Sequence, residues 1–190
     1  MSIGGLIFLG ILVVVLAYFT VIYNNLVRIK HNVSKAWANI DVLLKQRHDE
    51  LPKLVEVCKH YMKYEQETLE RVMRARSAVS SARERGDVEA LGPAESELRV
   101  GLGNLFAVAE AYPDLKANQN FQHLQQRVSA LENAIADRRE FYNESVNINN
   151  IRIEQFPDLF IARMFNFGAQ TLLEFAESEK ADVDMRTLFG

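Results

Sequence analysis

The chain has 190 residues, of which 22 are Lys or Arg and 25 are Asp or Glu, so its formal net charge is only −3. This balance does not favour binding to nucleic acid. Gly and Pro are scarce, and long stretches are rich in Ala, Leu, Glu, Lys, Arg and Gln, which predicts an all-α protein. The single cysteine, Cys58, excludes an internal disulfide.

The chain begins with an uncharged apolar stretch, residues 3–23, and its first charged side chain is Arg28. As a helix this stretch would be about 31 Å long, which matches the hydrocarbon thickness of a bilayer. Only helices and closed barrels cross lipid, and one segment cannot close a barrel. We therefore predict that residues 1–23 form a transmembrane anchor.

The alternative for this stretch is a cleaved signal peptide, which needs a basic N-terminal region, a shorter apolar core and a small-x-small cleavage site. None of these features is present, so an uncleaved anchor is favoured. Basic residues follow the stretch and none precedes it. The positive-inside rule then predicts an N-terminus outside and the rest of the chain in the cytoplasm. The basic residues that follow are Arg28, Lys30, Lys35, Lys45 and Arg47.

After the anchor, apolar side chains recur at spacings of three and four residues, which is typical of packed helices. The first such segment runs from Asn24 to about Glu50 and is expected to continue the anchor as one rod. A reversal or sharp kink is predicted at residues 49–52, because Pro52 removes a backbone donor and clashes with the preceding turn. A second helix is expected from about Lys53 to Arg85.

Two further helices are expected, one from near Val88 to residue 111 and one from Asn118 to Phe156. Short connections make consecutive helices antiparallel. Residues 24–157 are therefore predicted to form an elongated antiparallel four-helix bundle that continues from the transmembrane helix. Gly101 and Gly103 are expected to let a neighbouring helix approach closely.

The bundle topology should return the chain towards the membrane near Phe156. The next segment, residues 158–176, is amphipathic and rich in aromatic residues. We predict that it contacts lipid or another subunit, with a fold-back onto the end of its own bundle as the alternative. The candidate contact residues are Phe160, Met164, Phe165 and Phe167. Residues 177–190 are expected to be a mobile tail.

Two polar features stand out in the bundle. Asn133, Asn143 and Asn149 lie on or beside the inner face of the last helix, where we expect a buried hydrogen-bond network rather than a ligand site. The turn between the last two helices lies at the membrane-distal tip and is the candidate docking site for a protein partner, since loops often carry function. Its residues are Tyr112, Pro113, Asp114, Leu115, Lys116 and Asn118.

The sequence contains no catalytic or metal-binding constellation. None of the four histidines has a Glu three residues before it, and there is no HExxH or CxxC motif. Cys58 lies on an apolar stripe and is interpreted as a core residue. No catalytic residue, metal ligand or cofactor is therefore predicted, and a non-enzymatic protein is favoured.

Several short motifs occur in a characteristic order and together resemble the LemA family of bacterial membrane-anchored helical-bundle proteins. The most specific is Ala111-Tyr-Pro-Asp-Leu-Lys-Ala-Asn118, and others are Tyr23-Asn-Asn-Leu-Val27, Lys45-Gln-Arg-His-Asp49 and Phe165-Asn-Phe167. The resemblance implies an anchored antiparallel bundle with no agreed biochemical activity. It also implies an organising role, because some relatives belong to the magnetosome-membrane set and others sit near envelope proteases.

The leading hypothesis is a non-enzymatic scaffold or adaptor at the bacterial inner membrane, single-pass, with a cytoplasmic bundle. It is expected to form a homo-oligomer or to recruit a protein partner in the envelope. The alternative is a sensor that binds a small ligand or lipid in the bundle core near the asparagines.

Overall fold

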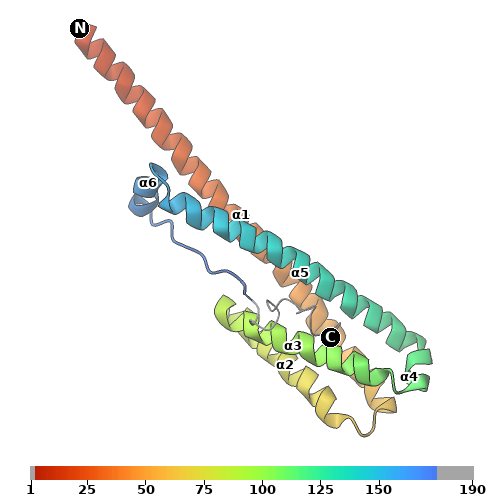
Figure 1. Cartoon of the computed structure of the whole chain (residues 1–190). Helices are drawn as coiled ribbons and strands as arrows, with labels where there is room; N and C mark the ends of the chain where they lie inside the picture. Colours follow the sequence, from red (N-terminus) through yellow and green to blue (C-terminus); the bar gives the residue numbers. More distant parts are fainter. Residues whose placement is uncertain (1–2, 175–190) are drawn as a thin grey trace, which may run out of the picture. The chain divides into compact units, whose positions relative to one another are not determined.

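The computed structural model describes residues 3–174, and every regular element in that range is a helix. The predicted all-α class is therefore confirmed, whereas the predicted tail, residues 177–190, lies outside the described residues. Figure 1 shows the six helices in chain order. They are α1 (Ile3–Tyr61), α2 (Gln66–Arg85), α3 (Val88–Ala109), α4 (Pro113–Ala117), α5 (Gln119–Glu154) and α6 (Asp158–Met164).

The described chain divides into two compact units. Residues 3–40 and 138–172 belong to unit 1, and residues 41–137 and 173–174 belong to unit 2. The long helices α1 and α5 each contribute to both units. Each unit has its own buried apolar residues, so the two are described separately.

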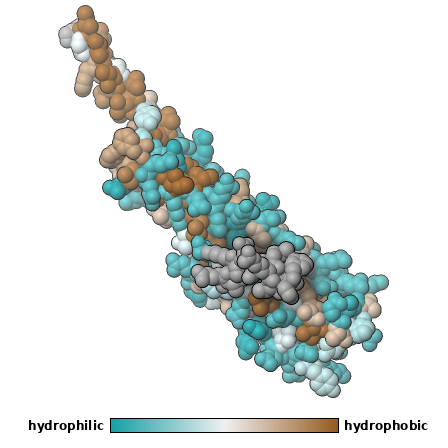
Figure 2. Space-filling model, in the orientation of Figure 1, coloured by the Kyte–Doolittle hydropathy of each residue, from teal (hydrophilic) through white to brown (hydrophobic). Residues whose placement is uncertain are grey.

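The N-terminal part of α1 is apolar and exposed. Among the described residues, α1 is the one helix long and apolar enough to cross a membrane. Its side chains between residues 3 and 21 are exposed, with the exception of the half-buried Phe19. Figure 2 shows this part of the helix as a continuous apolar rod. The predicted long apolar N-terminal helix is confirmed.

The predicted reversal at residues 49–52 is wrong, because α1 continues through Pro52 to Tyr61. Proline has no N–H, so the carbonyl of His48, four residues earlier, loses its helical donor. The Nε of Arg76 on α2 donates to that carbonyl oxygen at 2.9 Å. Arg76 therefore replaces the missing backbone donor, and the chain reverses later, between Tyr61 and Gln66.

Arg76 also holds the ring of His48. Its Nη2 lies 2.6 Å from the His48 Nε2. Burial and the nearby guanidinium lower the pKa of His48, which keeps the imidazole neutral and able to accept this hydrogen bond. The side chain and the carbonyl of His48 thus bind one arginine from the neighbouring helix.

In unit 2, α2 packs against α3 through a close approach. A Cβ on Gly101 of α3 would lie 3.5 Å from the Val72 Cγ2 of α2, an ordinary contact distance, so α2 does pass Gly101 but leaves room for an alanine there. For Gly103 the expected approach of a neighbouring helix is wrong, because a Cβ there would meet nothing within 4 Å. Gly86 ends α2 in the left-handed conformation (φ 65°), where glycine has no steric penalty.

Candidate functional site

The helix α6 folds back onto the end of the apolar stretch of α1 within unit 1. Ile161 and Ala162 of α6 are buried in one cluster with Ile22 and Leu26 of α1, and Ile153 of α5 completes it. Side chains of α6, α1 and α5 thereby form one buried apolar cluster in unit 1. Asp158 at the start of α6 is also buried, and its carboxylate pairs with the Arg152 Nη2 at 2.8 Å.

The candidate contact residues of this segment divide into two groups. The ring of Phe165 lies 6.0 Å from Phe19 and 4.8 Å from Tyr23, and Phe167 lies 5.9 Å from Tyr23, measured between centroids. Phe160 and Met164 point away from this cluster and remain 61% and 67% exposed. The segment therefore packs on its own chain and still presents an apolar outer surface.

After α6 the chain is not helical, and side chains of α5 bind its backbone. The Asn149 Nδ2 donates to the Gly168 carbonyl at 3.1 Å. Asn150 exchanges two hydrogen bonds with the backbone of Gln170, both 2.9 Å long. The Tyr142 hydroxyl donates to the Thr171 carbonyl at 2.9 Å. This extended segment, residues 165–174, is therefore recognised through its main chain.

The predicted asparagine network is only partly present. Asn149 is buried and Asn143 half-buried, but Asn133 is exposed and belongs to unit 2, so its expected burial is wrong. Asn133 lies two residues from both Leu131 and Ile135, which places it on the opposite side of α5. The amide nitrogen of Asn149, one of the asparagines near which the sensor hypothesis placed a ligand, donates to the chain itself.

A buried charged cluster at the centre of unit 2 was not predicted. Arg47 is 1% exposed and donates to Glu95 of α3 at 2.5 Å and to Glu132 of α5 at 2.6 Å. Burial alone would lower the pKa of Arg47, but the two carboxylates raise it, so the guanidinium stays charged. The cluster joins three helices through one side chain.

The candidate docking turn forms the short helix α4 with its flanking residues. Leu115 is buried, which leaves it inaccessible to a partner. Asn118 accepts a hydrogen bond from the Phe121 N–H and donates to the Tyr61 hydroxyl, each at 3.0 Å. The Tyr112 hydroxyl lies 3.5 Å from Glu65. Pro113, Asp114 and Lys116 are exposed, so a docking role for this turn stays a prediction that depends on these three residues.

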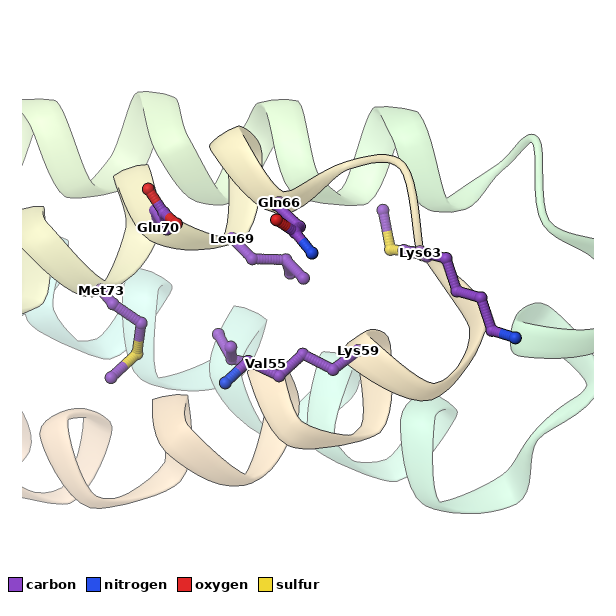
Figure 3. A pocket seen from close by; sticks show the side chains of 8 residues that line it. Val55, Lys59, Lys63, Gln66, Leu69, Glu70 and Met73 are labelled. Carbon is purple, nitrogen blue, oxygen red and sulfur yellow. The ribbon is translucent and has the colours of Figure 1, made fainter.

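A cavity of about 750 Å³ lies between the end of α1 and the start of α2. Figure 3 shows Leu69 and Gln66 of α2 facing Val55 and Lys59 of α1 across it. The cavity belongs to unit 2, whereas Asn143 and Asn149 belong to unit 1. It is therefore not the ligand site that the sensor hypothesis placed near the asparagines. Among residues 3–174, no group of three or more His, Cys, Asp or Glu side chains is arranged to hold a metal ion.

Cys58 is fully buried, and burial raises the pKa of its thiol to about 12. The thiolate is the reactive form, so we expect no labelling of the folded protein by a maleimide near neutral pH and complete labelling in denaturant. Mass spectrometry of the intact protein measures both. The variant Ser77→Cys, at an exposed position of α2, provides the positive control. Equal labelling rates at the two positions in the folded protein would contradict this expectation.

Comparison with known proteins gives the family. The sequence profile of the LemA family matches residues 36–186. The chain belongs to the LemA family. A relative is protein LemA of Metamycoplasma hominis, which is 27% identical over 167 residues, covering 87% of this chain and 74% of that protein. The resemblance inferred from the short motifs is thereby confirmed.

The chain is also similar to the magnetosome proteins MamQ 1 and MamQ 2 of Paramagnetospirillum magneticum. Each is 31% identical to this chain over 102 residues, which cover 54% of this chain and 37% of the MamQ protein. The match thus spans little more than a third of these relatives. None of these names is the name of an enzyme.

Proposed function

We propose that this LemA-family protein is a non-enzymatic scaffold or adaptor with a single-pass anchor in the bacterial inner membrane. The observation that carries the proposal is the helix α1. It is apolar and exposed over residues 3–21, and its later residues Leu51 and Leu54 are fully buried in unit 2. One helix therefore contains both the proposed anchor and residues of the core of unit 2.

The proposal includes an N-terminus outside and the helical body in the cytoplasm. It is supported by the exposed cations Arg28 and Lys30, which follow the apolar stretch of α1 directly. It also includes an antiparallel arrangement of the four helical segments between residues 24 and 157, which the short connections favour.

Self-association is supported by an apolar face on α5. Phe141, Ile148 and Ile151 are about half exposed, and their spacing of seven and three residues places them on one side of the helix. The buried residues Tyr142 and Val146 lie on a different side. A second copy of the chain would cover such a face as in a helical oligomer.

Disulfide crosslinking in native membranes tests this proposal. We expect Ile148→Cys to give a covalent dimer under mild oxidation, and Lys35→Cys, exposed on α1 of the same unit, to give much less. The buried Cys58 does not compete. Affinity capture from the same membranes, with and without substitution of Asp114 and Lys116, tests recruitment of a partner. A strictly monomeric protein with no bound partner would contradict the scaffold function.

A further inference from the structure

The exposed side chains of α6 continue the apolar surface of α1. Phe165 contacts Phe19 and Tyr23 at the end of the apolar stretch, and Phe160 and Met164 follow on the outer side of α6. Phe156, 80% exposed, packs its ring on Phe160 at 5.8 Å between centroids. Figure 2 shows apolar residues both along the N-terminal part of α1 and at the end of unit 1 beside it.

We propose that α6 lies in the lipid interface as a second membrane contact, with Phe160 and Met164 inserted among the lipids. The inference rests on the proposed anchor and adds a site to it. The two residues are four positions apart, so they point to the same side of a helix. Ile161 and Ala162 on the other side are buried against α1 and α5.

The depth of α6 along α1 fits the interface. Counted from Ile3, the contacts at Phe19 and Tyr23 lie 16 and 20 residues along the helix, or about 24 and 30 Å at 1.5 Å per residue. The hydrocarbon core is about 30 Å thick, so these contacts fall at its inner boundary. Aromatic side chains concentrate at this level in membrane proteins.

The charges near α6 also suit this position. The buried carboxylate of Asp158 is paired with Arg152, so it brings no uncompensated charge to the low-dielectric boundary. Arg163 is exposed on α6, and Arg28 and Lys30 are exposed on the next turns of α1. Long basic side chains at this level reach the lipid phosphates while their stems stay in apolar surroundings.

A lipid surface is favoured over a second copy of the chain as the partner of α6, because α6 lies beside the proposed anchor. Apart from Phe19, the apolar side chains of residues 3–21 are exposed, and in the proposed anchor lipid covers them. The surface formed by Phe160, Met164 and Phe165 adjoins that stretch directly. Lipid that covers the apolar stretch of α1 therefore also contacts the exposed side chains of α6.

Fluorescence quenching in the full-length protein tests the inference. The variants Phe160→Cys and Met164→Cys are labelled with an environment-sensitive fluorophore and reconstituted into vesicles of phosphatidylcholine and phosphatidylglycerol. The vesicles carry lipids with a nitroxide either near the headgroup or near the chain end. Both positions are exposed, so the substitutions remove no core packing. Asn39→Cys, at an exposed position of α1 in the same unit and outside the proposed self-association face, is the matched control.

We expect the headgroup-proximal quencher to act on positions 160 and 164 about threefold more strongly than on position 39. The variant Val13→Cys reports on the anchor separately and is expected to be quenched by the deep nitroxide. Quenching at position 13 without quenching at 160 and 164 would overturn the inference and leave the anchor standing. A disulfide dimer at position 160 without lipid quenching would overturn it in favour of a subunit contact. Failure of quenching at position 13 would overturn the proposed anchor and the inference with it.

Discussion

Replacing Arg47 by Met is expected to lower the free energy of unfolding by about 3–5 kcal/mol, because it removes the buried guanidinium that two carboxylates bind. Arg47 is 1% exposed and holds Glu95 and Glu132 at 2.5 and 2.6 Å. Urea unfolding of the full-length protein in detergent, followed by the helical circular dichroism signal, measures the change.

Two comparisons separate this effect from a general loss of an ion pair. Arg127 pairs with Glu50 at 2.9 Å but is 51% exposed, so Arg127→Met is expected to cost less than about 1 kcal/mol. The triple variant Arg47→Met, Glu95→Leu, Glu132→Leu removes all three charges and should recover most of the lost stability. If Arg47→Met and Arg127→Met lowered the free energy of unfolding equally, burial would not be the reason for the large effect expected at Arg47.

Replacing Gly92 by Ala is expected to displace the end of the extended segment from α3. A Cβ at this position would overlap the carbonyl oxygen of Glu174, and a backbone atom cannot move aside as a flexible side chain does. Leu173 beside it is 1% exposed and would lose its burial, which costs about 1.5–3 kcal/mol for a leucine. Hydrogen exchange in residues 165–174 should therefore accelerate by about tenfold or more.

Gly103→Ala in the same helix is the matched control for this experiment. A Cβ there meets nothing within 4 Å, so the substitution should only remove the helix penalty of glycine and stabilise α3 by about 0.5–1 kcal/mol. If both variants left the exchange of residues 165–174 unchanged, the close contact between Gly92 and Glu174 would not exist in solution.

Features with local causes were predictable from the sequence. The apolar stretch of α1 needs only length and lack of charge to be recognised. Gly86 ends α2 and Pro157 follows α5, each through its own backbone preference. The predicted ends of these two helices, Arg85 and Phe156, therefore lie within about two residues of the observed ones, a margin within which helix ends fray.

Pro52 misled the prediction because its compensation comes from a distant residue. The local rule for proline is valid only when the carbonyl four residues earlier stays unpaired. Arg76, 28 positions away from His48, donates to that carbonyl. No property of residues 48–52 by themselves indicates this donor.

One feature of the sequence does indicate the buried charged cluster of Arg47, Glu95 and Glu132. Glu95 falls between Leu91 and Leu98 at spacings of four and three, so a charged residue occupies the apolar stripe of α3. Such a residue requires a buried partner of opposite charge. The sequence does not say which basic residue supplies it, because Arg47 lies in a run of polar side chains.

The way in which α5 holds the extended segment determines which substitutions the chain tolerates. Tyr142, Asn149 and Asn150 bind this segment through its main-chain atoms, so these hydrogen bonds do not depend on the side chains at positions 168–171. These hydrogen bonds therefore restrict the residue type in this stretch at one position only. The Gln170 N–H donates to Asn150, so proline, which has no N–H, is the residue that this position cannot accept.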